Sequence, residues 1–118
     1  MEKQSIITKF MKNCMICGKP NVEIHHGLYG TAKHKLADED KLLMPLCSPH
    51  HNSSNKSVHM DYEMKILSKQ VSQLAWERKY LADKLMEIAD GSIGYQNSED
   101  WLDEAREAFR KRYGESYL

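Results

Sequence analysis

Four residues with metal-binding side chains occur as two closely spaced pairs, Cys14-x2-Cys17 and Cys47-x2-His50. A gap of two residues lets both side chains of a pair reach one ion from a tight turn, and zinc prefers four such ligands in a tetrahedron. Gly18 follows the first pair and supplies the backbone freedom that such a turn needs. The pairs therefore predict a closed structural zinc site that joins two distant parts of the chain and contributes to folding.

The cysteines have two other interpretations, as disulfides or as unrelated buried thiols. Cys14, Cys17 and Cys47 are an odd number, so disulfide pairing would leave one thiol over. Residues 1–12 lack the long apolar run of a secretory signal, and no stretch approaches the ~20 apolar residues of a membrane span. We therefore expect a cytoplasmic protein without a membrane partner, in which reduced thiols are available as metal ligands.

Four further histidines are not needed by the zinc site: His25, His26, His51 and His59. One zinc ion takes four ligands, and the three cysteines with His50 already supply them. In one interpretation these histidines are separate residues on a solvated surface. The alternative gathers them around a second divalent cation, and a cation with fewer protein ligands keeps a position open for substrate or water. A second, open metal site is therefore our hypothesis.

Short apolar runs predict an α+β fold for the histidine-rich part of the chain. Residues 22–25 alternate like a short strand, and residues 42–46 form a second apolar run that ends at Cys47. Gly27 and Gly30, followed by the polar residues 31–40, predict a long loop between the two strands. His34, between two lysines, is expected to be a solvated loop residue.

After His59 apolar residues recur at spacings of four and three, which predicts a helix of about thirty residues. The stripe is interrupted by Arg78 and consists of Met60, Met64, Leu67, Val71, Leu74, Leu81, Leu85 and Ile88. Gly91 is expected to follow the end of this helix, and a last helix is expected from Ser98 as N-cap to Gly114. The stripe either packs against the core and the last helix, or forms a homodimer interface.

The order of these residues resembles that of HNH endonucleases, and in particular small phage-encoded members such as recombination-enhancing nucleases. The resemblance rests on Cys14-Met-Ile-Cys17, Val22-Glu-Ile-His25-His26, Pro45-Leu46-Cys47-Ser-Pro-His50-His51 and Val58-His59, and it covers about residues 14–59. It implies a zinc-stapled ββα-metal (His-Me finger) core in residues 1–60, with residues 61–118 as a helical extension. The implied activity is metal-dependent hydrolysis of DNA in recombination, processing or packaging, inside a bacterial host cell.

The resemblance also implies roles for single residues. His26 corresponds to the general base, and His25 and His51 correspond to ligands of a catalytic divalent cation. His59 either completes that metal site, orients the phosphate or caps the following helix. Histidine ligands suit Mn²⁺, Ni²⁺ or Zn²⁺ better than Mg²⁺, which prefers oxygen. Glu23 is either a partner of a histidine ring nitrogen or an exposed carboxylate.

Charge is compatible with a DNA partner only in the first half of the chain. Residues 1–60 contain eight lysines and five acidic residues (+3), whereas residues 61–118 contain nine basic and twelve acidic residues (−3). A surface that faces phosphates is therefore expected in the first half. Its candidate contacts are Lys33, Lys35, Lys41 and Lys56, although scattered lysines are also typical of any wetted surface.

One departure from the family pattern keeps other functions open. Leu42 stands five residues before Cys47, where HNH enzymes have an asparagine that braces the loop holding the base, and Asn52 or Asn55 are candidate substitutes. A degenerate HNH domain that binds DNA or a protein without cutting is one rival hypothesis. Another is an accessory factor that cuts only together with a phage or host recombination protein.

Overall fold

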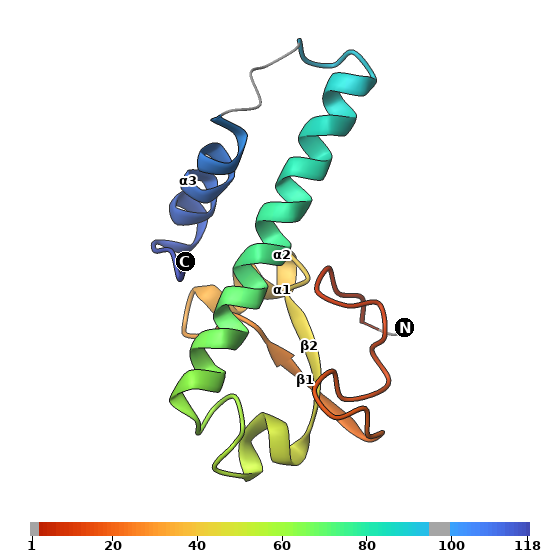
Figure 1. Ribbon diagram of the computed structural model, residues 1–118, viewed down its shortest axis with the longest axis vertical. Helices are drawn as coiled ribbons and strands as arrows, with labels where there is room; N and C mark the ends of the chain where they lie inside the picture. The colour runs from red at the N-terminus through yellow and green to blue at the C-terminus, as the bar shows by residue number, and fades with distance from the viewer. Residues whose placement is uncertain (1–2, 95–99) are drawn as a thin grey trace.

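The computed structural model describes residues 3–94 and 100–118 (Figure 1). The elements are, in chain order, β1 (Val22–His26), α1 (Lys33–Glu39), β2 (Leu43–Cys47), the π-helical turn η1 (Pro49–Ser53), α2 (Tyr62–Ala89) and α3 (Trp101–Tyr113). The two strands pair antiparallel, with Val22 opposite Cys47 and His26 opposite Leu43. The protein is therefore a small mixed α+β fold with a two-stranded sheet, in agreement with the α+β class that the sequence predicts.

The connection between the strands is not the loop that the sequence predicts. Residues 33–39 form α1, which buries Ala37 and packs Leu36 against the same cluster. Two adjacent apolar residues in seven are too few to give a helical period, and so short a helix is stable only through tertiary packing. His34 is exposed, as expected, but it lies on this helix.

Two small hydrophobic clusters hold the elements together. The first joins β2 to the N-terminal segment and to the segment before α2, and is formed by Cys14, Met44, Leu46, Cys47 and Val58. The second joins the β1–β2 connection to the C-terminal helix and is formed by Leu28, Ala37, Leu42, Phe109 and Tyr113. Through this second cluster α3 packs on the histidine-rich half of the chain.

The long helix α2 crosses the sheet and extends beyond it, with α3 alongside its outer part (Figure 1). It begins after Asp61, whose Oδ1 accepts a hydrogen bond from the N–H of Met64 at 3.0 Å. It ends at Ala89, and Gly91 follows with a φ of 84°, as predicted. Gly114 ends α3 in the left-handed conformation, also as predicted, whereas the expected N-cap Ser98 lies outside the described residues. None of the described helices is both long and apolar enough to cross a membrane.

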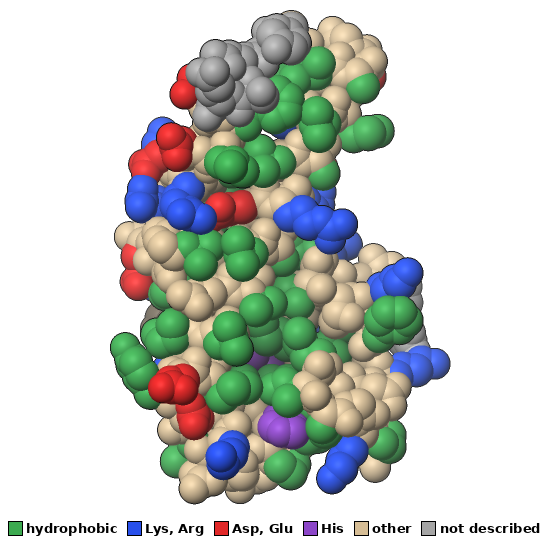
Figure 2. Space-filling model, in the orientation of Figure 1, with side chains coloured by type: hydrophobic (Ala, Val, Ile, Leu, Met, Phe, Trp, Pro, Cys, Tyr) green, Lys and Arg blue, Asp and Glu red, His purple; other side chains and the backbone are tan. Residues whose placement is uncertain are grey.

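The predicted apolar stripe is only partly the packed side of α2. Met64 and Val71 pack against the first hydrophobic cluster, but Leu67, Leu74 and Leu85 are 52–54% exposed. Hydrophobic side chains accordingly gather on the face seen in Figure 2. The buried side of α2 is polar instead and consists of Ser68, Ser72, Gln73, Glu77 and Lys84.

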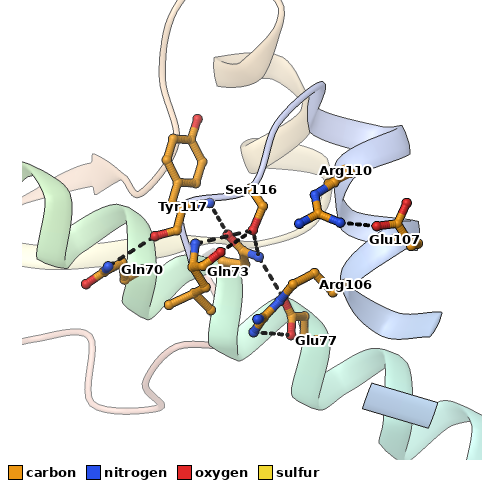
Figure 3. A network of polar contacts seen from close by, with 9 residues as sticks. Gln70, Gln73, Glu77, Arg106, Glu107, Arg110, Ser116 and Tyr117 are labelled. Atoms are coloured by element: carbon orange, nitrogen blue, oxygen red, sulfur yellow. Dashed lines mark hydrogen bonds and ion pairs between the residues drawn. The ribbon is translucent and has the colours of Figure 1, made fainter. Parts of the chain in front are cut away.

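Hydrogen bonds explain why a polar side of α2 can be buried. Gln73 is the centre of a network (Figure 3): its Nε2 donates to Glu77 Oε2 at 2.7 Å and to Ser116 Oγ at 2.9 Å. Its Oε1 accepts from the backbone N–H of Tyr117 at 2.7 Å. Because these groups satisfy one another, burial costs little, and the C-terminal segment is fixed against α2. A hydrophobic period cannot reveal such packing.

Candidate metal centres

The four residues of the two spaced pairs meet in one place, which we call the thiolate cluster: Cys14, Cys17, Cys47 and His50. One potential ligand atom from each lies within 4.8 Å of all the others, so the cluster can hold a metal ion. The Sγ atoms of Cys17 and Cys47 are 3.6 Å apart, and His50 Nδ1 is 3.2 Å from Cys47 Sγ and 3.7 Å from Cys14 Sγ. All three cysteines are free thiols, as the sequence predicts.

Local backbone contacts place these four side chains. The N–H of Gly18 donates to Cys14 O at 2.8 Å and closes the turn that carries the first pair, with Gly18 at a φ of 78°. The N–H of Met15 donates to Pro45 O at 2.9 Å, which attaches that turn to β2. Cys47 is the last residue of β2, and η1 brings His50 back towards it. The zinc-type pairs thus come from a turn and from a strand end, as their spacing indicates.

Thiol ionisation in the thiolate cluster is uneven. Burial opposes ionisation of Cys14, but backbone N–H groups of Cys47, Cys17 and Ile16 outweigh it and lower the pKa of Cys14 to about 6. Burial raises the pKa of Cys47, and so do the neighbouring thiols. A bound cation would favour deprotonation of every thiol in the cluster.

A second group, the histidine cluster, consists of His25, His51 and His59. One ring nitrogen of each lies within 4.8 Å of the other two, and the ring centroids are 4.9–5.3 Å apart. The Nε2 atoms of His51 and His59 are 3.2 Å apart. His59 therefore lies in the cluster, and the N-cap of α2 is Asp61.

His25 is the most enclosed member of the histidine cluster. Its side chain is 2% exposed, and its Nε2 is buried without a hydrogen-bond partner among the described residues. Burial and the nearby His59 and His51 lower the pKa of His25 to about 3, and burial likewise lowers the pKa of His59. Neutral imidazoles offer lone pairs to a cation, and an unpaired buried nitrogen is costly unless something binds it.

Glu23 lies beside the histidine cluster because side chains alternate along a strand. Residues 23 and 25 of β1 share one face of the sheet, and Glu23 Oε1 is 2.7 Å from His51 Nδ1. A carboxylate can only accept, so His51 donates from Nδ1 and presents the lone pair of Nε2 to the cluster. Of the two roles considered for Glu23, this contact supports that of a partner to a histidine ring nitrogen.

His26 points to the opposite face of β1 and is not a member of the histidine cluster. Its Nε2 lies 3.1 Å from Asp38 Oδ1, and its ring is 3.8 Å from that of His34, at an interplanar angle of 33°. Both partners are on α1. The structure therefore separates His26 from the three residues that can hold a cation.

The other residues considered from the sequence lie away from the two clusters or have other partners. Leu42 is fully buried in the second hydrophobic cluster, and Asn52 and Asn55 are exposed. Lys33 donates to Glu115 Oε2 at 2.8 Å and to the hydroxyl of Tyr117 at 3.0 Å. The remaining candidate phosphate contacts are exposed: Lys35, Lys41 and Lys56.

Two neighbours of the site were missed by sequence analysis, Asp38 and Tyr29. The Tyr29 ring packs 5.1 Å from that of His59 and 5.7 Å from that of His25, and its hydroxyl is buried without a partner among the described residues. Asp38 is one of three consecutive acids, residues 38–40, and no spacing rule distinguishes it from the other two. Asp38 could have been placed near His26 only if residues 33–39 had been recognised as a helix.

Comparison of the chain with protein-family models, curated proteins and solved structures gives no match. The two clusters and the surroundings of His26 are therefore the basis for assigning a function.

Proposed function

We propose that this protein is a metal-dependent DNA endonuclease of the HNH type. The observation that carries the proposal is that neighbouring histidines have different surroundings. His50 and His51 belong to different clusters, and His26 contacts Asp38 and not the cluster that contains His25. Metal-assisted phosphodiester hydrolysis needs a cation site with a position open to substrate and a histidine that is not a metal ligand, and a structural ion can hold such a small fold together.

The thiolate cluster fits Zn²⁺ as its structural ion. Zn–S bonds of about 2.3 Å and Zn–N bonds of about 2.0 Å give a tetrahedron whose S···S and S···N edges are roughly 3.5–3.8 Å. The distances of 3.6 Å between Cys17 and Cys47, 3.7 Å between Cys14 and His50 and 3.2 Å between Cys47 and His50 are close to those edges. Three thiolates and an imidazole also exclude Mg²⁺ and Ca²⁺, which prefer oxygen.

The histidine cluster fits a second divalent cation such as Mn²⁺, Ni²⁺ or Zn²⁺. Bonds of about 2.1 Å from one ion to two imidazoles place the nitrogens roughly 3.0–3.5 Å apart, and Nε2 of His51 and His59 are 3.2 Å apart. Three protein ligands leave room for substrate and water. When bound, the cation supplies positive charge that offsets the charge of the phosphate and of the leaving oxygen.

His26 then acts as the general base. It accepts a proton from the water whose oxygen attacks phosphorus, while the bond from phosphorus to the 3′-oxygen breaks. The 3′-oxygen takes a proton from solvent water, which leaves 5′-phosphate and 3′-hydroxyl ends. A neutral imidazole is suited to this task near neutral pH, and such a base contributes typically ~10²–10⁴ in rate. His26 directly follows the potential ligand His25 and is the last residue of β1, with its side chain on the opposite face of the strand.

A non-cleaving DNA-binding module is the second candidate function, favoured by Leu42. In the family that the sequence resembles, an asparagine at this position braces the loop that holds the base, and a buried leucine has no group for that task. Such a module would retain the zinc ion and its affinity for DNA, but lack hydrolysis.

Cleavage of supercoiled plasmid by the zinc-loaded protein separates the two candidates. We expect nicking or linearisation in the presence of Mn²⁺, Ni²⁺ or Mg²⁺, and a loss of at least about 100-fold in rate for His26→Ala. Ser53→Ala, at an exposed position of η1, is the matched control and should cleave like the wild type. Cleavage that is absent, or equal in His26→Ala, would contradict the nuclease and leave the binding module.

A further inference from the structure

The side chain of His26 lies beside a carboxylate on α1, that of Asp38. Asp38 Oδ1 lies 3.1 Å from His26 Nε2 and also accepts from Lys3 Nζ at 3.0 Å. Lys3 and His26 together lower the pKa of Asp38, so this group is a carboxylate at neutral pH. The His34 ring covers one face of the His26 ring, at 3.8 Å.

The position of Asp38 is set by packing, although its side chain is 48% exposed. The neighbouring Ala37 is fully buried in the second hydrophobic cluster together with Leu42. The N–H of Leu42 donates to Ala37 O at 2.9 Å, and Leu42 O accepts from Gly27 N at 2.8 Å. Leu42 therefore ties α1 to the residue that follows His26, and it does so through its backbone and its hydrophobic contacts.

We propose that Asp38 is a positioning residue that fixes the ring orientation and tautomer of His26, and so takes over the bracing role of the missing asparagine. The proposal rests on the nuclease function proposed above. A carboxylate can only accept a hydrogen bond, so neutral His26 carries its proton on Nε2 and its lone pair on Nδ1. Nδ1 is then the atom that takes the proton from water, and Asp38 has the role that an aspartate has towards histidine in a catalytic triad.

The contact also restricts the His26 ring. Without the carboxylate, rotation about the Cβ–Cγ bond would exchange the positions of Cδ2 and Nδ1, and either tautomer would be available. The His34 ring, inclined by 33° to that of His26, lies against its face and so does not prevent this exchange. Asp38 is therefore expected to change turnover, and not the binding of DNA or of the cation.

The test measures steady-state cleavage and the His26 tautomer for Asp38→Ala, Asp38→Glu and the wild type. We expect Asp38→Ala to lower kcat by about 10- to 100-fold, with KM and Mn²⁺ affinity within about twofold of the wild type. Asp38→Glu, which restores a carboxylate, should recover part of kcat. In ¹⁵N-edited spectra of the zinc-loaded protein, His26 should show the Nε2–H tautomer, and Asp38→Ala should show a mixture.

Two controls isolate the contact. Lys3→Met removes the other partner of Asp38, and Glu39→Ala removes an acid of α1 that pairs with Arg112. Both should leave kcat within about threefold of the wild type, because His26 keeps Asp38.

The outcomes are distinguishable from failure of the nuclease proposal. A wild type that does not cleave counts against the nuclease itself. If the wild type cleaves and Asp38→Ala has the same kcat, or the same His26 tautomer, only the role of Asp38 is overturned. A fall in kcat accompanied by an equal loss of Mn²⁺ affinity would also overturn it, since Asp38 would then act on the histidine cluster.

Discussion

The thiolate cluster and the histidine cluster take neighbouring residues of the chain, His50 and His51, but differ in the type, number and surroundings of their potential ligands. The thiolate cluster has four potential ligands from two short motifs, and two of them, Cys14 and Cys47, also belong to the first hydrophobic cluster. The histidine cluster has three ligands from β1, η1 and the segment before α2, with Glu23 behind one of them. The first can complete a coordination sphere, whereas the second leaves part of one open.

His50 and His51 show how neighbouring residues come to serve different clusters. Successive residues of a helical turn point in different directions, so η1 directs His50 towards Cys47 and His51 towards β1. The segment that follows is held to the same turn, because Val58 N donates to His50 O at 2.8 Å and His59 N donates to His51 O at 3.2 Å. Two backbone hydrogen bonds thus place His59 next to His51.

Substitution of these two neighbours should give the largest and most clearly opposed effects. We expect His50→Ala to lose its structural zinc and most of its cooperative unfolding, because zinc binding in such sites provides about 10 kcal/mol. His51→Ala should keep zinc and its fold but lose metal-dependent cleavage. Circular dichroism with thermal unfolding, zinc content by elemental analysis and plasmid cleavage measure the three properties.

Met15→Ser is the control for this comparison, since it lies in the Cys14–Cys17 turn and its side chain is exposed. It should keep both zinc and cleavage. A His51→Ala variant that unfolds like His50→Ala would show that the two clusters form a single structural unit, which would remove the basis for separate roles.

The thiolate cluster was predictable from the sequence because each pair of its residues is close together in the chain. Two gaps of two residues are enough to identify a zinc-type site, and they do not depend on the rest of the fold. The histidine cluster followed less directly, as the histidines that zinc does not need, and the sequence grouped His26 with them only by adjacency. Alternation along β1 separates His26 from His25, and the turn of η1 separates His50 from His51.

The parts that were not predictable depend on contacts between distant residues. Helix α1 carries no periodic signal, so Asp38 was not expected near His26. The apolar stripe of α2 predicts either packing within the chain or a homodimer interface, and neither reveals that Gln73 and its polar neighbours are buried through hydrogen bonds to the C-terminal segment. Gly27 also lies against Ser72 of this polar side, where a Cβ on residue 27 would collide with the serine side chain.

A second substitution asks whether His26 needs an asparagine at position 42, where the HNH enzymes that the sequence resembles have one. Leu42→Asn would bury an amide among Leu28, Phe109 and Tyr113, which costs roughly 2–7 kcal/mol when the amide has no partner. We expect its free energy of unfolding to fall by about 3 kcal/mol in urea denaturation of the zinc-loaded protein, without faster cleavage. Leu42→Met, which conserves volume, should lose less than about 1.5 kcal/mol.

A Leu42→Asn variant that is as stable as the wild type and cleaves faster would contradict this view. It would mean that the amide reaches the loop after β1, and that Leu42 occupies a position of the site and not of the core. The bracing role of Asp38 would then be unnecessary.

The smallest expected effect concerns Glu23, which affects only the histidine cluster. Glu23→Gln keeps an oxygen near His51 Nδ1 but removes the charge that makes His51 a stronger donor of electrons to a cation. We expect Mn²⁺ to bind about 10- to 100-fold more weakly, as followed by electron paramagnetic resonance of the zinc-loaded protein, with zinc content and thermal stability unchanged. Glu63→Gln, in the first turn of α2, is the matched control. Because Glu23 lies opposite Leu46, one residue from Cys47, loss of zinc in Glu23→Gln would mean that the strand pair transmits changes from one cluster to the other, and their independence would fail.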